Sequence, residues 1–396
     1  MNILFVSDQP FNPVYGGIER VTDLIVRELL RRGGYEITYL CEKVKDQSIM
    51  EYDYPVKVVT LPYEGGFHNL ANITFYTQFI KDSQIDIVIN QRGSYDFMDN
   101  VLHLEGAKTI SVVHTVVDGS LKYLMASIIL SGGTFLRQCK SFIKKLIYPL
   151  YYYIKYQHFS QQLREHYQAL VQRSSALVLL SEADSKHLKR NYECQGCPII
   201  AIPNPCWYGI YQEGKDRENV ILYVGRLVDI EKKPIRMIKI WEKLYRKYQD
   251  WRLIIVGDGE EREKMERYTS RRGIERVFFE GQQTNVEKYY KKASFICLTS
   301  QFEGWGMALT EGMSFGCVPF TFDNYGAAFD IVDDNVNGCL IPAYDLKSYA
   351  LRLSELMDNP TKRKEFSNEA MKKSKMFSVS SVVDKWENLF KEVSKQ

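Results

Sequence analysis

Short apolar segments typical of buried strands alternate with helical segments along most of this chain. In the first part, the predicted strands span residues 3–7, 36–41, 56–61, 85–90, 108–113, 176–181 and 199–202. Between the first two, Ile18, Val21, Ile25 and Leu29 recur at three- and four-residue spacing, which predicts an amphipathic helix over residues 18–32. Strand, helix and strand in this order predict a parallel sheet covered by helices.

The same alternation begins again after a proline-bearing stretch at residues 202–205. The second series of predicted strands spans residues 220–224, 252–256, 277–280, 295–299 and 318–322. We therefore predict two facing doubly wound Rossmann-like α/β domains, over residues 1–205 and 206–378, and a C-terminal helix within residues 379–396 that closes back toward the first domain. Because ligands bind beyond the carboxyl ends of such strands, we expect the active site in the cleft between the domains.

Composition excludes several classes of protein. The 396 residues, 45% of them hydrophobic, suffice for two cores, and a formal net charge of +3 argues against a nucleic-acid partner. The sequence has no uninterrupted apolar run of about 18 residues, and residues 1–7 lack the features of a secretory signal. The eight scattered cysteines fit reduced thiols. We expect a cytoplasmic protein, with a peripheral position on the inner face of the membrane as an open alternative.

Positive charge gathers in residues 120–164, which contain seven basic residues and no acidic one. Apolar residues recur there at helical spacing, flanked by lysines and tyrosines, and Pro149 is expected to break or kink the helix. Two interpretations remain open with equal weight. The segment either lies in the plane of an anionic membrane or is a helical insertion packed on the first domain, with its lysines merely solvated.

Residues 187–206 contain cysteine and histidine residues of the kind that bind zinc. Cys194 and Cys197 form a close pair, with His187 before them and Cys206 after them. A second close pair is missing, so an incidental loop is strongly favoured and no metal site is predicted.

Two loops that follow predicted strands carry glycine and basic residues. Gly16 and Gly17 open the helix over residues 18–32, where free N–H groups can meet an anion; the alternative is a loop that needs a positive φ. Gly225 and Arg226 follow the first strand of the second series, and Lys232 follows them. Arginine and lysine suit a diphosphate without a metal, although these residues alone favour a solvated basic loop.

Residues 302–313 carry two glutamates eight positions apart. Glu303 lies in a loop, and Glu311 lies about two turns into the next helix. If both residues were helical, they would lie about 12 Å apart along the axis, too far to act as an acid/base pair. If the glycine-rich loop bends back, Glu303 lies near a sugar ring and Glu311 reaches a ribose. The N–H groups of Gly306, Met307 and Ala308 could then meet phosphates. The alternative is two surface glutamates around a helix start.

These motifs together resemble one enzyme family. Residues 302–313, Phe-Glu-Gly-Trp-Gly-Met-Ala-Leu-Thr-Glu-Gly-Met, resemble the paired-glutamate signature of the retaining nucleotide-sugar glycosyltransferases of family 4, which have the GT-B fold. Residues 223–227, Tyr-Val-Gly-Arg-Leu, followed by Lys232, resemble the family's phosphate clamp. Residues 16–20 are similar to its N-terminal glycine loop, and residues 202–205 to its interdomain stretch. The matches follow the family's order along nearly the whole chain.

The resemblance implies roles for individual residues. It places Arg226 and Lys232 on the donor diphosphate, Glu311 on the ribose and Glu303 near the transferred sugar. His114 would lie beside that sugar, although by itself it is more often an ordinary histidine at a strand end. The backbone around Gln282 would cradle the base.

The resemblance also implies a reaction. A sugar would move from a nucleotide-sugar, such as a UDP- or GDP-sugar, to a glycan or lipid-linked acceptor in surface polysaccharide or glycolipid assembly, with retention of configuration and no separate cofactor. The sequence has no Asp-x-Asp motif, which suits metal-independent transfer. Two alternatives remain: a nucleotide-sugar epimerase on a similar fold, and a catalytically silent scaffold or sugar-binding module.

Overall fold

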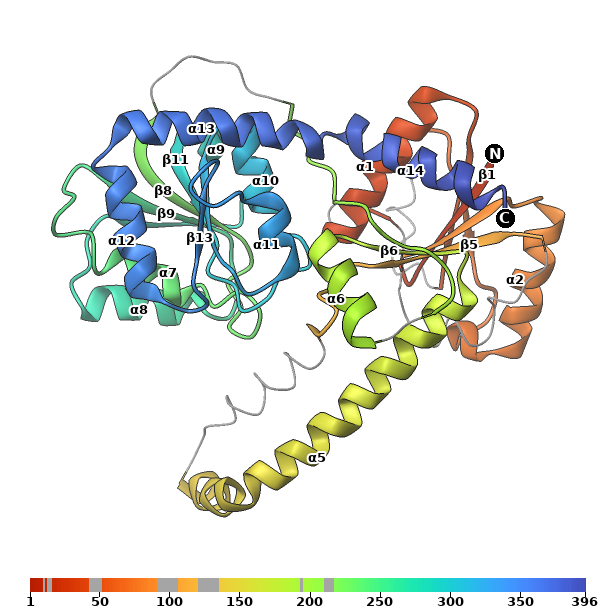
Figure 1. Ribbon diagram of the computed structural model, residues 1–396, viewed down its shortest axis with the longest axis horizontal. Helices are drawn as coiled ribbons and strands as arrows, with labels where there is room; N and C mark the ends of the chain where they lie inside the picture. Colours follow the sequence, from red (N-terminus) through yellow and green to blue (C-terminus); the bar gives the residue numbers. More distant parts are fainter. Residues whose placement is uncertain are drawn as a thin grey trace. The chain divides into compact units, whose positions relative to one another are not determined.

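The computed structural model describes residues 1–9, 11–12, 16–42, 52–91, 106–119, 135–192, 195–209 and 217–396, and for residues 135–152 it describes the helical backbone alone. The chain divides into two compact units (Figure 1). The N-terminal unit comprises Met1–Leu179, Asp184–Ala201 and Asn388–Gln396, and the C-terminal unit comprises Leu180–Ala183 and Ile202–Glu387. The end of the chain packs on the N-terminal unit, where the rings of Tyr35 and Phe390 lie 6.3 Å apart.

A seven-stranded parallel sheet forms the centre of the N-terminal unit, in the order β3-β2-β1-β4-β5-β6-β7. The strand order reverses between β1 and β4, which makes their carboxyl ends the switch point of the sheet. The strands are β1 Asn2–Ser7, β2 Glu36–Cys41, β3 Lys57–Thr60, β4 Ile87–Asn90, β5 Lys108–Val113, β6 Ala176–Leu179 and β7 Ile199–Ala201.

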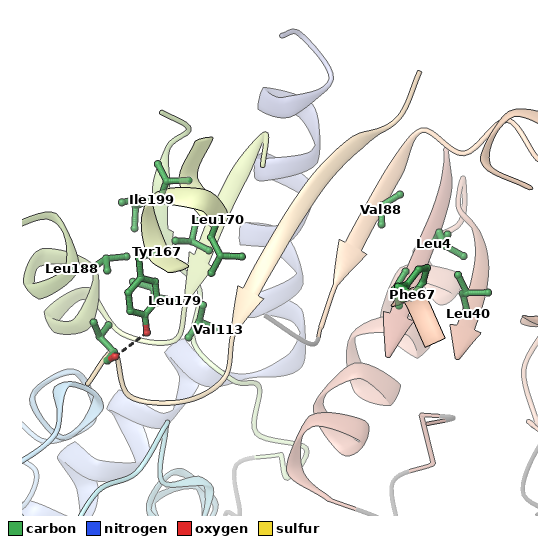
Figure 2. Close-up of a cluster of buried hydrophobic side chains, with 14 of the residues drawn as sticks. Leu4, Leu40, Phe67, Val88, Val113, Tyr167, Leu170, Leu179, Leu188 and Ile199 are labelled. Atoms are coloured by element: carbon green, nitrogen blue, oxygen red, sulfur yellow. Dashed lines mark hydrogen bonds between the residues drawn. The ribbon is translucent and has the colours of Figure 1, made fainter. Parts of the chain in front are cut away.

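Helices connect these strands. They are α1 Gly17–Arg32, the 3-10 helix η2 Gly66–His68, α2 Leu70–Asp82, α5 Phe135–Arg173 and α6 Glu182–Tyr192. The predicted end of α1 at Arg32 is correct, because Gly33 takes a left-handed φ of 82° and donates its N–H to the Leu29 carbonyl. One continuous core joins strands and helices, as Figure 2 shows for Leu4, Leu40 and Val88 on the strands and Leu170 on α5.

Helix α5 contains 39 residues and continues through Pro149, so Pro149 does not end the helix. Its C-terminal part joins the core, and the Tyr167 hydroxyl there donates to the Val117 carbonyl over 2.9 Å (Figure 2). Farther toward its start, Tyr153 and Ile154 are 60% and 58% exposed. Figure 1 shows the first half of α5 extending away from the sheet of its own unit.

Despite the length of α5, none of the described helices is both long enough and apolar enough to cross a membrane.

The C-terminal unit is built on a six-stranded parallel sheet in the order β10-β9-β8-β11-β12-β13. Its order reverses between β8 and β11. The predicted fold class of two Rossmann-like α/β units is therefore confirmed, although the short strand β13 was not predicted. The strands are β8 Glu218–Val224, β9 Arg252–Val256, β10 Val277–Gly281, β11 Ala293–Cys297, β12 Val318–Phe322 and β13 Cys339–Ile341.

Helices cover this second sheet. Helix α10 packs on β11, β12 and α13, while α7 packs on α8 and α12. The helices are α7 Ile235–Trp241, α8 Arg262–Arg271, α9 Glu287–Tyr290, α10 Met307–Ser314, α11 Gly326–Ile331, α12 Leu346–Met357, α13 Pro360–Ser374 and the 3-10 helix η3 Lys375–Phe377. The last helix, α14 Val379–Val393, starts in this unit and ends in the N-terminal unit, which includes Asn388–Gln396. Trp241 and Tyr349 are fully buried, and the Trp241 indole donates to the Glu275 carbonyl over 2.9 Å.

Candidate active site

The switch point of the C-terminal sheet brings together two of the residues singled out from the sequence. Lys232 follows β8 and Glu303 follows β11, and these two strands are hydrogen-bonded neighbours. The Lys232 Nζ lies 2.6 Å from Glu303 Oε1 and 2.7 Å from Oε2. Because parallel strands end at one edge, residues 71 positions apart form a direct ion pair.

The Glu303 carboxylate is almost fully enclosed. Its side chain is 8% exposed, and the Ser300 hydroxyl donates to Oε1 over 2.6 Å, in addition to the two bonds from Lys232. A carboxylate at this depth requires a cation and hydrogen bonds to remain charged. Ser300 had no sequence signal beyond its position three residues before Glu303.

Arg226 lies in the same loop as Lys232 but has a different partner. Its guanidinium lies 2.7 Å from Glu231 Oε2, and its side chain is 67% exposed. Both cations expected at a diphosphate therefore have carboxylate partners in this structure.

The loop that carries Arg226 is held against the end of β9. Gly225 donates its N–H to the Val256 carbonyl over 3.0 Å, and Leu227 donates to the Asp258 carbonyl over 2.9 Å. Gly257 has φ +136°, and a Cβ placed on it would lie 2.0 Å from the Gly225 carbonyl oxygen. Only glycine permits this approach of two backbones.

Helix α10 begins at this edge. Gly306 takes a left-handed conformation, φ 92° and ψ 52°, and the helix starts at Met307 and Ala308. Its first N–H groups supply the partial positive charge of a helix N-terminus. Because α10 begins at Met307, Glu311 lies little more than one turn from the start of the helix. The predicted position of Glu311, about two turns into the helix, is therefore wrong.

Glu311 faces a buried aromatic cluster. The Tyr290 hydroxyl donates to Glu311 Oε2 over 2.6 Å, and Glu311 is 6% exposed. Burial, followed by the charge of Glu311, raises the pKa of the Tyr290 phenol well above its usual value. Tyr290 therefore remains a hydrogen-bond donor that fixes the Glu311 carboxylate, a partner that the sequence did not reveal.

Gln282 follows β10, which lies two strands from β8 in the sheet. Its side chain is exposed, and the preceding Gly281 takes φ +66° and accepts a hydrogen bond from the Gly257 N–H. The expected role of this backbone at a base stays a prediction.

In the N-terminal unit, Gly16 and Gly17 open α1 as predicted. Gly16 has φ −177°, which is extended backbone, and neither glycine has a positive φ. The alternative that this loop needs a positive φ is therefore wrong for both residues. A Cβ on Gly16 would lie 2.6 Å from the Glu19 carboxylate, and one on Gly17 would meet no atom within 4 Å in the part of the chain that the structure describes.

His114 follows β5 and forms a hydrogen bond with the amide oxygen of Gln91, which follows the neighbouring strand β4. Gln91 was missed in the sequence, although its position directly after a buried strand was an available signal. Burial lowers the pKa of the His114 imidazole to about 4. His114 is therefore neutral near pH 7 and acts as a hydrogen-bonding group rather than as a cation.

The lowered pKa of His114 predicts a pH-dependent stability. The unfolded imidazole, with a pKa of about 6.5, takes up a proton before the folded one does, so stability present above pH 6.5 is lost as the pH falls toward 4. We expect His114→Gln to reduce the loss of unfolding free energy between pH 7 and pH 5 by about 2 kcal/mol, measured by urea unfolding. An unchanged loss would show that His114 titrates normally.

The residues of the zinc alternative are not brought together where the structure describes them. Cys194 lies outside the described residues. His187 lies 2.8 Å from Asp118 in the N-terminal unit, and Cys206 is buried in the C-terminal unit. No group of three or more metal-ligating side chains occurs among the described residues.

Comparisons with known proteins match both units. The family described as Glycosyltransferase Family 4 matches residues 15–206, and that described as Glycosyl transferases group 1 matches residues 211–373. A relative from Campylobacter jejuni, GalNAc-alpha-(1->4)-GalNAc-alpha-(1->3)-diNAcBac-PP-undecaprenol alpha-1,4-N-acetyl-D-galactosaminyltransferase, is 30% identical over 55% of this chain and 60% of its own. Poly(ribitol-phosphate) alpha-N-acetylglucosaminyltransferase of Staphylococcus aureus is 26% identical over 54% of this chain and 44% of its own. The chain thus spans less than two thirds of the length of these curated relatives.

Solved structures match the chain over nearly its full length. The lipopolysaccharide outer core galactosyltransferase WaaB is 19% identical, with a TM-score of 0.70 over 99% of this chain and all of the other. Anabaena HepE in complex with UDP is 17% identical, with a TM-score of 0.71 over the same shares. At these identities the likeness establishes the GT-B fold alone.

Proposed function

Because this chain belongs to glycosyltransferase family 4, we propose that it transfers a sugar from a nucleotide-sugar to a glycan or lipid-linked acceptor with retention of configuration. The observation that carries the proposal is the Lys232–Glu303 ion pair at the switch point of the C-terminal sheet, beside the N-terminus of α10. A cation, a carboxylate and free helix N–H groups at one strand edge are the parts that a sugar diphosphate requires.

We assign the donor contacts within the C-terminal unit. Lys232 and Arg226 bind the diphosphate, replacing their present partners Glu303 and Glu231 with phosphate oxygens. Glu311 binds the ribose, and Glu303, once released from Lys232, faces the transferred sugar. HepE, which shares the fold, is described in complex with UDP, which supports a UDP- or GDP-sugar as donor.

The chemical step follows from charge. As the glycosidic bond lengthens, negative charge grows on the departing diphosphate, and the Lys232 ammonium, the Arg226 guanidinium and the first N–H groups of α10 stabilise it. The acceptor hydroxyl attacks from the side of the leaving group, which retains the configuration. These charges come from side chains and backbone, so we propose that transfer requires no metal and no separate cofactor.

An assay with donor alone separates this function from its alternatives. We expect slow hydrolysis of a UDP- or GDP-sugar to the nucleoside diphosphate. Chromatography of the reaction mixture over time would measure it. An epimerase would instead yield an altered nucleotide-sugar. If no nucleoside diphosphate raises the melting temperature, the chain is a silent module and the proposal is wrong.

We further propose that the acceptor is presented at an anionic membrane on the cytoplasmic side, through residues 120–164. Residues 120–134 lie outside the described residues, but α5 begins at Phe135 and its first half leaves the sheet (Figure 1). Farther along α5, Tyr153 and Ile154 are exposed apolar side chains. The relatives' names include an undecaprenol-linked acceptor, which supports a lipid-linked substrate.

Sedimentation with liposomes tests the membrane proposal. We expect the protein to sediment with anionic liposomes at low salt and to remain in the supernatant at high salt, since screening weakens the attraction. Lys140/Lys144/Lys145→Glu should abolish sedimentation, whereas Lys362/Lys364/Lys372→Glu, an equal charge change on α13, should preserve it. Wild-type protein that stays in the supernatant at low salt would refute the proposal.

The Tyr290–Glu311 contact predicts a defect in donor binding. Tyr290→Phe removes the donor that fixes Glu311, so we expect the KM for the nucleotide-sugar to rise about tenfold with kcat within a factor of about two. Tyr289→Phe is the matched control, because Tyr289 donates to Glu280 over 2.8 Å instead. Equal effects of both substitutions, measured by steady-state kinetics, would show that Glu311 has no special role.

A further inference from the structure

Tyr223 carries a buried hydroxyl that has no partner. It is the last residue but one of β8, and its side chain is fully buried. Among the described residues, its hydroxyl makes no hydrogen bond. An unpartnered buried hydroxyl destabilises a folded protein, and phenylalanine would fill the same space without that cost. The stability of the fold in this structure therefore does not explain why residue 223 is a tyrosine and not a phenylalanine.

The position of this hydroxyl relates it to the donor site. A methyl group on Gly225 would lie 3.6 Å from the Tyr223 oxygen, so the hydroxyl lies beside the turn that leads to Arg226. Glu303 follows β11, which pairs with β8, so both residues lie at the same edge of the sheet. Burial most strongly, and then the charge of Glu303, raises the pKa of the Tyr223 phenol, while Arg226 lowers it. The phenol therefore stays protonated and can donate a hydrogen bond.

We propose that Tyr223 is a positioning residue that donates its free hydroxyl to Glu303 when the donor diphosphate takes Lys232. This inference rests on the proposed function. In the present state, Lys232 supplies two of the hydrogen bonds that Glu303 accepts. When a diphosphate binds Lys232, the enclosed carboxylate loses both, and the Ser300 hydroxyl remains. The Tyr223 hydroxyl then keeps Glu303 charged and oriented toward the sugar.

A double-mutant cycle tests this role. The affinities for UDP and GDP are measured by calorimetry for wild type, Tyr223→Phe, Glu303→Gln and the double variant. We expect Tyr223→Phe to weaken binding of the preferred nucleotide about tenfold, as for a lost hydrogen bond to a charged group. In the Glu303→Gln background the same change should have little effect, because Tyr223 acts through the carboxylate.

Stability separates this role from a structural one. Tyr223→Phe should leave the melting temperature without ligand unchanged or higher. The control is Tyr349→Phe, because the Tyr349 hydroxyl donates to the Phe320 and Leu298 carbonyls over 2.8 and 3.2 Å. That variant should lower the melting temperature and leave nucleotide affinity unchanged.

Each outcome decides a different claim. Wild-type affinity in Tyr223→Phe, or an equal loss with and without the Glu303 carboxylate, would overturn the role of Tyr223 and leave the donor site intact. If wild type binds neither UDP nor GDP, the proposed function fails, and this inference fails with it.

Discussion

Replacement of Lys232 by alanine is expected to reduce turnover of the nucleotide-sugar by about 10²–10³-fold, the usual loss when one fixed group that stabilises developing charge is removed. The side chain is held at the switch point of the sheet, 20% exposed, where its charge is poorly screened. Arg226→Ala should act in the same direction. Steady-state kinetics with donor and acceptor would measure both.

Two further variants separate chemistry from folding. Lys232→Ala leaves the buried Glu303 carboxylate without its cation, which destabilises a fold by about 3–5 kcal/mol. Lys232→Ala/Glu303→Gln removes that charge as well, so it should recover stability and remain inactive. Lys233→Ala is the matched control, because Lys233 pairs with Asp229 over 3.0 Å and should keep its turnover. Wild-type kinetics in both Lys232→Ala and Arg226→Ala would refute the donor site.

Gly257→Ala is expected to destabilise the C-terminal unit by about 3–5 kcal/mol and to abolish activity. The added Cβ would lie 2.0 Å from the Gly225 carbonyl oxygen, and the φ of +136° is itself unfavourable for alanine. Since both groups in the overlap are backbone, relief requires the Arg226 loop to move. Urea unfolding and donor turnover would measure the two effects.

Gly106→Ala separates the overlap from the backbone strain. Gly106 has a similar φ of +112°, but a Cβ there would meet no atom of the described residues within 4 Å. We therefore expect Gly106→Ala to lower the free energy of unfolding by about 1–2 kcal/mol and to leave the donor turnover unchanged. If Gly257→Ala lowers the free energy of unfolding no more than Gly106→Ala does, the close approach of Gly257 to Gly225 does not determine stability.

Periodicity predicted the two sheets well because buried parallel strands are nearly continuous apolar runs. β2, β5, β9 and β12 have the predicted bounds. β13 contains only three residues, Cys339–Ile341, too few to show a pattern. Pro149 shows the opposite limit: a local rule predicted a break or a kink, and the break is wrong because α5 is continuous through Pro149.

The candidate site was predictable to the extent that it lies in loops directly after strands. The parallel order alone explains why Lys232 and Glu303 meet. Ser300 and Tyr290 could not be found, because their roles depend on which side chain lies opposite in space. Gln91 was missed although its position directly after a buried strand was an available signal. Tyr223 is the clearest case, since its pattern is that of an ordinary core residue and only its unpartnered hydroxyl distinguishes it.

The central claim is that the switch point of the C-terminal sheet binds the donor of a sugar transfer. A crystal structure with a bound nucleoside diphosphate tests it most directly. We predict the diphosphate on Lys232 and Arg226 at the start of α10, the ribose within hydrogen-bond distance of Glu311, and Glu303 released from Lys232. A nucleotide bound elsewhere, with the Lys232–Glu303 pair still closed, would contradict the account.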